Sequence, residues 1–491
     1  MSEEAEVLGT IEQLLDTFRA PAVMVHRPYS PLGLPPTRSR LGGLPLLPDA
    51  FEWPKGRSTI GEGEIPLHFL AQIDCAELPR IDAAMPTQGM LFFFGRDDEE
   101  QLWGDTKPHD DARIIYAPRV SPDQRERPAP AALPPIRGEF YRGSPFPLPG
   151  DSGPSVHASW PVALLPIDTW PDVSALLENK IFRKAVLSCR PYFEKIGRFE
   201  KVIDKDPLWA AVLEFDRARE PFGELYDQRL NALRLGTIAS ATGQTPPAKA
   251  KPDWPSGFKQ GSRLAFDPSP NSRPFPQVAV MIDRIARLIV LQATSLLDHR
   301  DYQNEEKRQP LERTKETGLY WVNRCKEIGP EIIPSQADAQ GFASWLKQLS
   351  GDPSIVSDNG PTIYSPYLRG GLNDIFSKAI LSTIQYAAQS PKVAAAIPAS
   401  FYDAFADQHL PFAFRFGSKI LSPEFHQMLG HDRSCQDAKP VDSGAVLLLQ
   451  LGDDDVLNMG FGDVGSASFW IERKDLEQLR FENAWGEIVG H

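Results

Sequence analysis

The sequence predicts an α+β protein in which the two strand-rich ends of the chain form one domain around a large, mostly α-helical insert. Short apolar runs separated by turn residues occur near both ends, whereas apolar residues recur at helical spacing through the middle. A strand-turn-strand pattern is also repeated between the two ends, which indicates duplicated hairpin units. We expect a split α+β domain over residues 1–120 and 420–491, a proline-rich connector over 121–172 and a helical insert module over 173–419.

The first residues, MSEEAEVLGTIEQLLDTFR, predict an amphipathic surface helix. They carry acids where a secretory signal requires positive charge. Strand patterns follow from Ala22 to about Tyr116. Within them Phe92, Phe93 and Phe94 are consecutive. Because alternate side chains of a strand point to opposite faces, these three rings predict a central strand that is covered on both faces.

Prolines recur throughout the segment from Pro118 to Pro171 and predict an extended connector on the surface. Proline removes a backbone donor and fixes φ, which disfavours both helix and central strand. Helical spacing then runs from Val173 to Phe416, interrupted by a predicted loop at Gly243 to Gly257. Its most apolar stretch, RIARLIVLQATSLLDHR, is broken by a glutamine and is shorter than the ~20 residues that a membrane span needs. We therefore expect no contact with a membrane.

The internal repeat pairs LFFFGRDDEEQLWGD, residues 91–105, with LLLQLGDDDVLNMGFGD, residues 447–463. Each copy contains an apolar strand, an acidic turn and an aromatic-Gly-Asp sequence, and each continues into another apolar strand. This pattern predicts a repeated β-hairpin whose acidic triplet, Asp97-Asp98-Glu99 or Asp453-Asp454-Asp455, lies in a solvated loop. A repeated fold explains a feature found in both halves more simply than one catalytic centre does.

Charge and cysteine content disfavour several functional classes. The 52 Lys and Arg residues against 65 Asp and Glu residues give a formal net charge of −13, so we expect no nucleic-acid partner. The four cysteines are each more than 100 positions from the next, which leaves no short-range zinc or redox pair. Free thiols in a reducing cytoplasm are the simplest interpretation. The four residues are Cys75, Cys189, Cys325 and Cys435.

The GDVG turn at Gly462 to Gly465 could bind a phosphate, bind a metal or turn a hairpin. It leads into a strand and has an acid at its centre, unlike a phosphate-binding loop. The neighbouring acids lack the alternate-residue spacing of a calcium loop. We therefore expect neither cofactor nor metal, and we interpret Asp463 as an acceptor for backbone N–H groups that stabilises the turn. Nucleophile signatures around serine or cysteine are also missing from the sequence.

His426 is the titratable residue that most suggests a function. It lies in SPEFHQMLGHDRSCQD, where Ser-Pro-Glu resembles a helix start and Gly430 a helix stop, so we expect His426 on a short helix. On one interpretation it lines a pocket with other polar residues, including His431. The alternative is that His426 caps or packs between the two halves of the domain. The candidate binding residues are Gln72, Asp74, His426, Gln427, Gln436 and Asp463.

Four sequence blocks resemble signature blocks of the YwqG-like family, bacterial domains with no established biochemical function. They are SRLGGLPLLPDAFEWP, PLHFLAQIDCAELP, HQMLGHDRSCQ and GFGDVGSASFWIERKDL, and they fall within roughly residues 35–120 and 420–491. The chain departs from the family pattern at Asp432, where relatives usually have proline, and at Phe461, where they have tryptophan. The resemblance implies an α+β fold, a cytoplasmic location and a place among toxin-immunity or stress-associated genes, but no activity.

Three functional classes remain open. The first is a cytoplasmic binding protein, immunity-type or partner-regulating, that holds another protein of basic character. The second is an enzyme of unknown reaction that uses dispersed carboxylates and His426, which requires His426, Asp74 and Asp463 to converge in one concave site. The third is a structural scaffold, which a large exposed apolar patch on the insert would favour. We prefer the first class, and the oligomeric state is left open.

Overall fold

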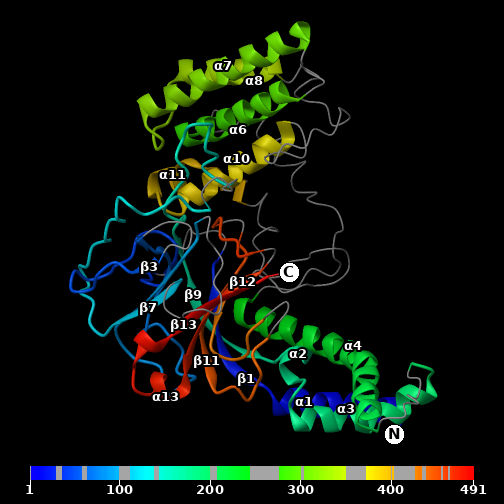
Figure 1. The fold of residues 1–491 in the computed structure, drawn as a ribbon. Helices are drawn as coiled ribbons and strands as arrows, with labels where there is room; N and C mark the ends of the chain where they lie inside the picture. Colours follow the sequence, from blue (N-terminus) through cyan, green and yellow to red (C-terminus); the bar gives the residue numbers. More distant parts are fainter. Residues whose placement is uncertain are drawn as a thin grey trace.

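Two β-sheets pack face to face at the centre of the protein, with helices at either end (Figure 1). A T-shaped contact joins Phe93 of one sheet to Phe469 of the other, with ring centroids 5.2 Å apart. The predicted α+β class is confirmed. The computed structural model describes residues 2–28, 36–57, 63–98, 111–137, 143–198, 207–243, 276–299, 304–349, 372–399, 401–402, 426–433, 438–454, 457–462 and 465–490.

The larger sheet joins the first strand of the chain to its last strands. Its six strands have the order β13-β12-β11-β10-β1-β9, and all neighbours are antiparallel. β1 lies between β9 and β10, so segments more than 400 residues apart share a hydrogen-bonded ladder. The bounds are β1 Ala20–His26, β9 Ala163–Thr169, β10 His426–Met428, β11 Ala445–Gly452, β12 Ser466–Glu472 and β13 Trp485–Val489.

The second sheet has five strands in the order β7-β6-β5-β2-β8. β6 is a central strand with every residue buried, as the three consecutive phenylalanines predicted. Phe93 faces the larger sheet, whereas Phe92 and Phe94 face a separate cluster that contains Trp53. The bounds are β2 Arg40–Leu41, β5 His68–Asp74, β6 Met90–Gly95, β7 Ala112–Ala117 and β8 Trp160–Pro161, and β3 Lys55–Arg57 pairs with β4 Glu64–Pro66 as a small ribbon.

The sequence repeat corresponds to two antiparallel hairpins, one in each sheet. β6 pairs with β7 in the first copy, and β11 pairs with β12 in the second. In both copies the strand that precedes the hairpin begins with a buried histidine, His68 in β5 and His426 in β10. The duplicated hairpin is therefore a structural repeat as well as a sequence repeat.

The proline-rich segment contributes two edge strands, which corrects the expectation of a purely extended connector. β8 ends the smaller sheet beside β2, and β9 ends the larger sheet beside β1. Pro161 and Pro166 lie within these strands. An edge strand tolerates proline because the N–H that proline lacks can face away from the ladder. Both proline-containing strands lie at sheet edges, and neither is central.

One group of helices joins the N-terminus to the segment after β9. The predicted amphipathic N-terminal helix is present as α1 and buries Val7, Ile11, Leu14 and Leu15. It packs with α3 and α4 around an apolar cluster of their own. The end of α4 also covers β1 and β9, because Ile238 contacts Ala22 and Met24. The bounds are α1 Glu3–Thr17, α2 Val173–Leu176, α3 Lys180–Lys195 and α4 Pro207–Thr242.

A second group of helices stacks at the opposite end of the sheets (Figure 1). The apolar α6 contacts both α7 and α10, which explains why it is buried almost all round. None of the helices in the described ranges is long and apolar enough to cross a membrane. The loop predicted from Gly243 lies, beyond that glycine, outside the described residues. The bounds of this group are α6 Ala279–Asp298, α7 Glu305–Ile328, α8 Gln336–Leu349, α10 Leu372–Ala387 and α11 Pro391–Ala396. The short α13 Arg473–Leu476 lies beside β12, and the 3-10 helix η4 Phe481–Asn483 lies beside β7.

Gly318 allows α6 and α7 to approach closely, so we expect Gly318→Ala to destabilise the protein. A Cβ at this position would lie 2.6 Å from a methyl carbon of Val290, which is stiff because it is β-branched. Overpacking of this kind costs about 1–3 kcal/mol. Urea unfolding would measure the loss. Gly236→Ala in α4 is the matched control because nothing lies within 4 Å of its Cβ, and it should stabilise by up to about 1 kcal/mol. Equal effects from the two variants would contradict the close contact.

Candidate functional site

His426 lies on a strand, and the expectation of a short helix was wrong. Residues 426–428 form β10, in which all three side chains are buried. His426 pairs with Val25 of β1, and Gln427 pairs with Gln450 of β11. The helix-start residues Ser422 to Glu424 lie outside the described residues. Pairing between distant strands has therefore overridden the local signal.

Both ring nitrogens of His426 are engaged within the protein. The Gly452 N–H donates to Nδ1 at 3.2 Å, which places the ring proton on Nε2. Nε2 lies 3.3 Å from Oδ2 of Asp454. The same carboxylate accepts from Arg27, with Nε 2.6 Å from Oδ2 and Nη2 3.2 Å from Oδ1. The Arg27 guanidinium in turn lies 5.1 Å from the centroid of the Trp160 ring.

Asp454 is a buried, ionised member of this group. Burial alone would raise its pKa, but the positive charge of Arg27 and the hydrogen bond from His426 hold the pKa well below its ordinary value. Its side chain is fully buried, and that of His426 is nearly so. The arrangement stabilises the ends of β1, β10 and β11 and presents no free base to solvent.

The first hairpin copy carries a corresponding group. The Asp97 N–H donates to Nδ1 of His68 at 3.1 Å, and Nε2 of His68 lies 3.0 Å from the carbonyl oxygen of Pro134. Burial lowers the pKa of His68. Asp97 lies beside His157, whose Nε2 is 3.0 Å from Oδ2 of the carboxylate. Asp97 and Asp454 each stand two residues beyond the last residue of their strand, so the two acids occupy matching positions. Their histidine partners differ, because Asp454 faces His426 and Asp97 faces His157.

The expectation that both acidic turns are solvated was wrong for Asp97, Asp98 and Asp454, whereas Asp453 is half-buried. Asp97 and Asp454 are fully buried, and Asp98 is nearly so. Each carboxylate lies beside a cation: Asp98 is 3.2 Å from Arg96, and Asp97 is 3.7 Å from Arg137. Arg137 is distant from Asp97 in the sequence, and Arg96 belongs to the same charged run as the acids. The pattern of charges along the sequence therefore predicted an exposed loop. Glu99 and Asp455 lie outside the described residues.

Arg137 connects the acidic turns of the two copies. Its backbone N–H donates to the Asp97 carbonyl at 2.6 Å, and its Nη2 donates to the Asn458 carbonyl at 3.0 Å. Gly460 lies directly against this guanidinium, where any Cβ would collide with it. The polar residues between the hairpins therefore hold the two halves together.

The other predicted site residues are divided between the two sheets. In β5, Gln72 accepts from the Leu46 N–H at 2.9 Å and donates to the Arg38 carbonyl at 2.7 Å. Asp74 accepts from the Ala76 N–H at 2.9 Å and lies 3.7 Å from Arg38. Gln427 donates to the His431 carbonyl at 2.6 Å. Gln436 and Asp463 lie outside the described residues, so the predicted role of the Asp463 turn stays a prediction.

The described chain offers few groups for metal or thiol chemistry. Across the described ranges, no cluster of three or more His, Cys, Asp or Glu side chains could hold a metal ion. Cys75, Cys189 and Cys325 are free and buried. Burial raises the pKa of the Cys75 and Cys325 thiols to about 12, which keeps both protonated.

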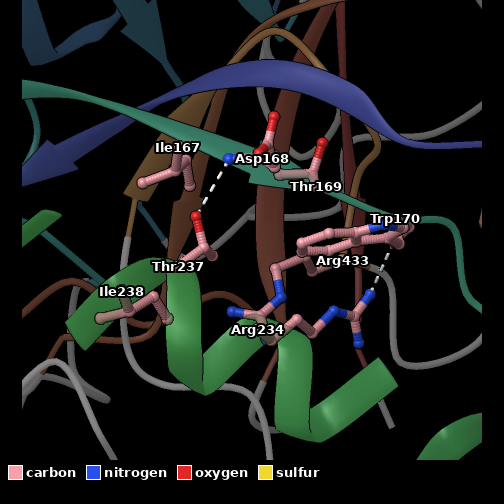
Figure 2. Close-up of a pocket in the computed structure, with 8 residues that line it drawn as sticks. All are labelled: Ile167, Asp168, Thr169, Trp170, Arg234, Thr237, Ile238 and Arg433. Carbon is pink, nitrogen blue, oxygen red and sulfur yellow. Dashed lines mark hydrogen bonds between the residues drawn. The ribbon is translucent and has the colours of Figure 1, made fainter. Parts of the chain in front are cut away.

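A pocket that sequence reasoning did not predict lies between β9 and the end of α4 (Figure 2). The space that it offers to a water-sized molecule is small, about 10 Å³. Arg433 lies in the loop after β10 and belongs to the HQMLGHDRSCQ block that suggested the family resemblance. Its place in that block is the feature of the sequence that could have indicated this residue. Its partners come from a distant helix and from the proline-rich segment, so the pocket exists only after folding. The lining residues are Ile167, Asp168, Thr169 and Trp170 at β9, Arg234, Thr237 and Ile238 on α4, and Arg433.

Two guanidinium groups, those of Arg234 and Arg433, line one side of the pocket. Arg234 is held by Oδ1 of Asp172 and by the Trp170 carbonyl, each at 3.0 Å. Burial, and then the like charge of Arg234, hold the pKa of Arg433 well below its ordinary value, while Asp172 opposes the shift. On the other wall, the Asp168 N–H donates to Oγ1 of Thr237 at 3.1 Å, and the Asp168 carboxylate lies 3.2 Å from Arg19.

Asp432 adjoins this pocket and is buried. Burial raises its pKa to about 7, although the Lys439 N–H donates to it at 3.4 Å, and the charges of Asp172 and Glu487 raise the pKa further. The neighbouring His431 donates its backbone N–H to Thr169 at 3.0 Å, and burial lowers its pKa. Asp432 is therefore the described carboxylate beside the pocket that changes charge near neutral pH.

Asp454→Asn should cost about 3–5 kcal/mol of unfolding free energy, because it leaves the buried Arg27 without its counter-charge. Chemical denaturation at pH 7 would measure this cost. Glu224→Gln is the matched control: it removes an exposed carboxylate that pairs with Arg198 at 2.6 Å, and it should cost less than about 1 kcal/mol. A loss for Asp454→Asn as small as that of the control would show that the buried ion pair is not structural.

Asp432→Asn should stabilise the protein increasingly as pH rises. The folded-state pKa of about 7 exceeds the unfolded value of 3.8, so the folded state binds more protons between those values. The parent therefore loses stability as pH rises from about 4 to 7, by about 4 kcal/mol in total, and the asparagine variant escapes this loss. Unfolding free energies of both proteins at pH 4.5, 6 and 7.5 would measure the difference. A difference that does not change with pH would contradict burial of an ionising Asp432.

Comparison with known proteins adds one match. Residues 39–259 and 371–488, together more than half of the chain, match the family described as Domain of unknown function (DUF1963). The unmatched residues 260–370 contain α6, α7 and α8, a narrower region than the insert expected from sequence. No curated protein matches the chain significantly. This chain is therefore a member of the DUF1963 family, a domain whose function is unknown.

Proposed function

We propose that this protein acts by holding a partner protein and not by turning over a substrate. The observation that carries this proposal is the closed hydrogen bonding of His426. A general base needs a ring nitrogen that can reach a proton of the substrate. Nδ1 of His426 faces the Gly452 N–H, and Nε2 faces Asp454. Both ring nitrogens of His68 in the other hairpin copy are also engaged, by the Asp97 N–H and the Pro134 carbonyl, which supports a role in the fold.

The remaining reactive groups also support binding over catalysis. Asp454 is tied to Arg27 and His426, so its carboxylate is held in an internal ion pair. A cysteine acts as a nucleophile only as the thiolate, and Cys75 and Cys325 have pKa values of about 12. An enzyme built on the predicted carboxylates would also need Asp74 close to His426, whereas Asp74 lies beside Arg38 in the smaller sheet.

The chemistry of the partner follows from charge and resemblance. A formal net charge of −13 steers a basic protein towards this one and repels nucleic acid. The four sequence blocks that resemble the YwqG-like family would place the protein in the bacterial cytoplasm, as an immunity-type or partner-regulating factor. A basic, nucleic-acid-directed toxin is a partner of the required charge.

The outer face of α7 is the contact surface that we propose. Tyr320 is 57% exposed and Leu319 is 36% exposed, and Glu316 is exposed one turn earlier on the same helix. An exposed tyrosine beside an acid suits a basic partner, because tyrosine is among the residues that most often dominate binding energy at interfaces. α7 belongs to the layer farthest from the sheets and lies outside the family match (Figure 1). A surface of this kind can differ between family members without altering the shared fold.

Tyr320→Ala should weaken partner binding at least tenfold while leaving the fold intact. Affinity capture with the full-length protein would first identify the partner, and association kinetics with the purified partner would then measure affinity. Ile181→Ala is the matched control, since Ile181 is 54% exposed on α3 in the other helical group. It should leave affinity unchanged. Raising the salt concentration should slow association with the parent, because salt screens charges beyond ~8–10 Å.

His426→Gln separates binding from catalysis. A folded His426→Gln variant should still hold the partner with the affinity of the parent, because His426 is buried away from α7. The proposal fails if capture yields no protein partner and if a hydrolytic or transfer activity of the parent disappears in this variant. It also fails if Tyr320→Ala and Ile181→Ala bind the captured partner as tightly as the parent.

A further inference from the structure

We propose that Asp432 is a pH-sensitive latch, which holds helices α1 to α4 against the larger sheet while it is protonated and loosens this contact when it ionises. Asp432 lies a few residues after β10, and only 6% of it is exposed. The latch lies on other elements than α7 and needs no partner protein. It is therefore independent of the binding role proposed for α7.

The chain around Asp432 is bonded to the helices. Nε2 of His431 lies 2.7 Å from the carbonyl oxygen of Phe18, the residue that caps the end of α1. Further along the chain, the Val441 N–H donates to the carbonyl of Ala175 in α2 at 3.3 Å. These contacts fasten the segment that follows β10 to the helical group.

The same segment is bonded to the larger sheet. The His431 N–H donates to Oγ1 of Thr169 in β9 at 3.0 Å. The Arg433 N–H donates to Oε1 of Gln450 in β11 at 2.9 Å. Asp432 therefore lies between contacts to the helices and contacts to the sheet. A charge that this buried position disfavours is relieved when the segment moves away from both layers and water reaches the carboxylate.

Acids face Asp432 from both layers. The charges of Asp172, which precedes α2, and of Glu487 in β13 both disfavour its ionisation. Cations near these two acids already pair with them. Arg234 of α4 lies 3.0 Å from Asp172, and Nζ of Lys439 lies 2.7 Å from a carboxylate oxygen of Glu487. The Asp432 carboxylate itself accepts from the Lys439 N–H at 3.4 Å, which is a long hydrogen bond.

These surroundings set the direction of the pH response. His431 and Arg433 flank Asp432 in the chain, and burial lowers the pKa of both. Burial raises the pKa of Asp432 to about 7, and the two facing acids add to this shift. In an opened segment the carboxyl group regains its ordinary pKa of 3.8. Opening therefore becomes more favourable as pH rises from about 4 to about 7, and it levels off above that range.

Hydrogen exchange of backbone amides in the full-length protein would test the latch. Protection of the His431 and Val441 amides, corrected for the intrinsic exchange rate, should fall at least about tenfold between pH 5 and pH 7.5. In Asp432→Asn, which cannot ionise, protection should be nearly equal at the two pH values. Asp168→Asn is the matched control, because it removes a partly exposed carboxylate of β9 that pairs with Arg19. This control should keep the response of the parent.

Glu487→Gln keeps the test decisive if Asp432→Asn fails to fold. It removes one facing acid and releases Lys439, so protection should stop falling at a lower pH than in the parent. Amides of the central strand β6 should stay more protected than those of His431 and Val441, because the opening is local.

Three results would overturn the latch. The first is protection in the parent that does not change with pH. The second is a pH response that survives in Asp432→Asn, that is lost in Asp168→Asn or that levels off at the same pH in Glu487→Gln. The third is exchange of the His431 and Val441 amides as slow as that of β6, because these amides would then exchange only through global unfolding.

Discussion

The buried ion pair between Arg27 and Asp454 is the interaction on which the rest of the structure depends. It joins the end of β1 to the turn after β11, and Asp454 also accepts from the first residue of β10. Arg27 lies over Trp160 of the smaller sheet, and Trp160 donates its indole N–H to the Pro28 carbonyl at 3.0 Å. This ion pair therefore connects the end of β1 with the turn after β11, and Arg27 also contacts the smaller sheet through Trp160. Burying such a pair adds little net stability, but the loss of either partner is costly, so the pair specifies one arrangement of the chain.

The two hairpin copies use their most polar residues for architecture. His68 and His426 occupy corresponding positions. Each accepts a backbone N–H at Nδ1, from Asp97 just after β6 for His68 and from Gly452 at the end of β11 for His426. Arg137 then connects the two acidic turns. These groups contact one another inside the protein. The contact surface that we propose, the outer face of α7, lies instead on a helix beyond the sheets (Figure 1).

Much of the fold could be predicted from the sequence because local patterns reflect local physical demands. The apolar spacing of the first helix matches the residues that α1 buries, and three consecutive phenylalanines indicated a strand that is covered on both faces. The repeated strand-turn-strand pattern indicated the two hairpins. The candidate site was less predictable. Of its residues, Gln72 and Asp74 lie around Arg38, whereas His426 and Gln427 lie in the other sheet.

By itself, the sequence determined the α+β class, the duplication and the helical character of the middle. The tertiary structure alone decided whether a polar residue is exposed. The acidic turns are buried because Arg27 and Arg137 reach them from distant segments, and His426 is on a strand because β1 and β11 supply its hydrogen-bonding neighbours. The pocket joins Arg234 to Arg433 across almost 200 residues. Local spacing cannot encode such contacts, because they depend on which distant segments the packed core brings together.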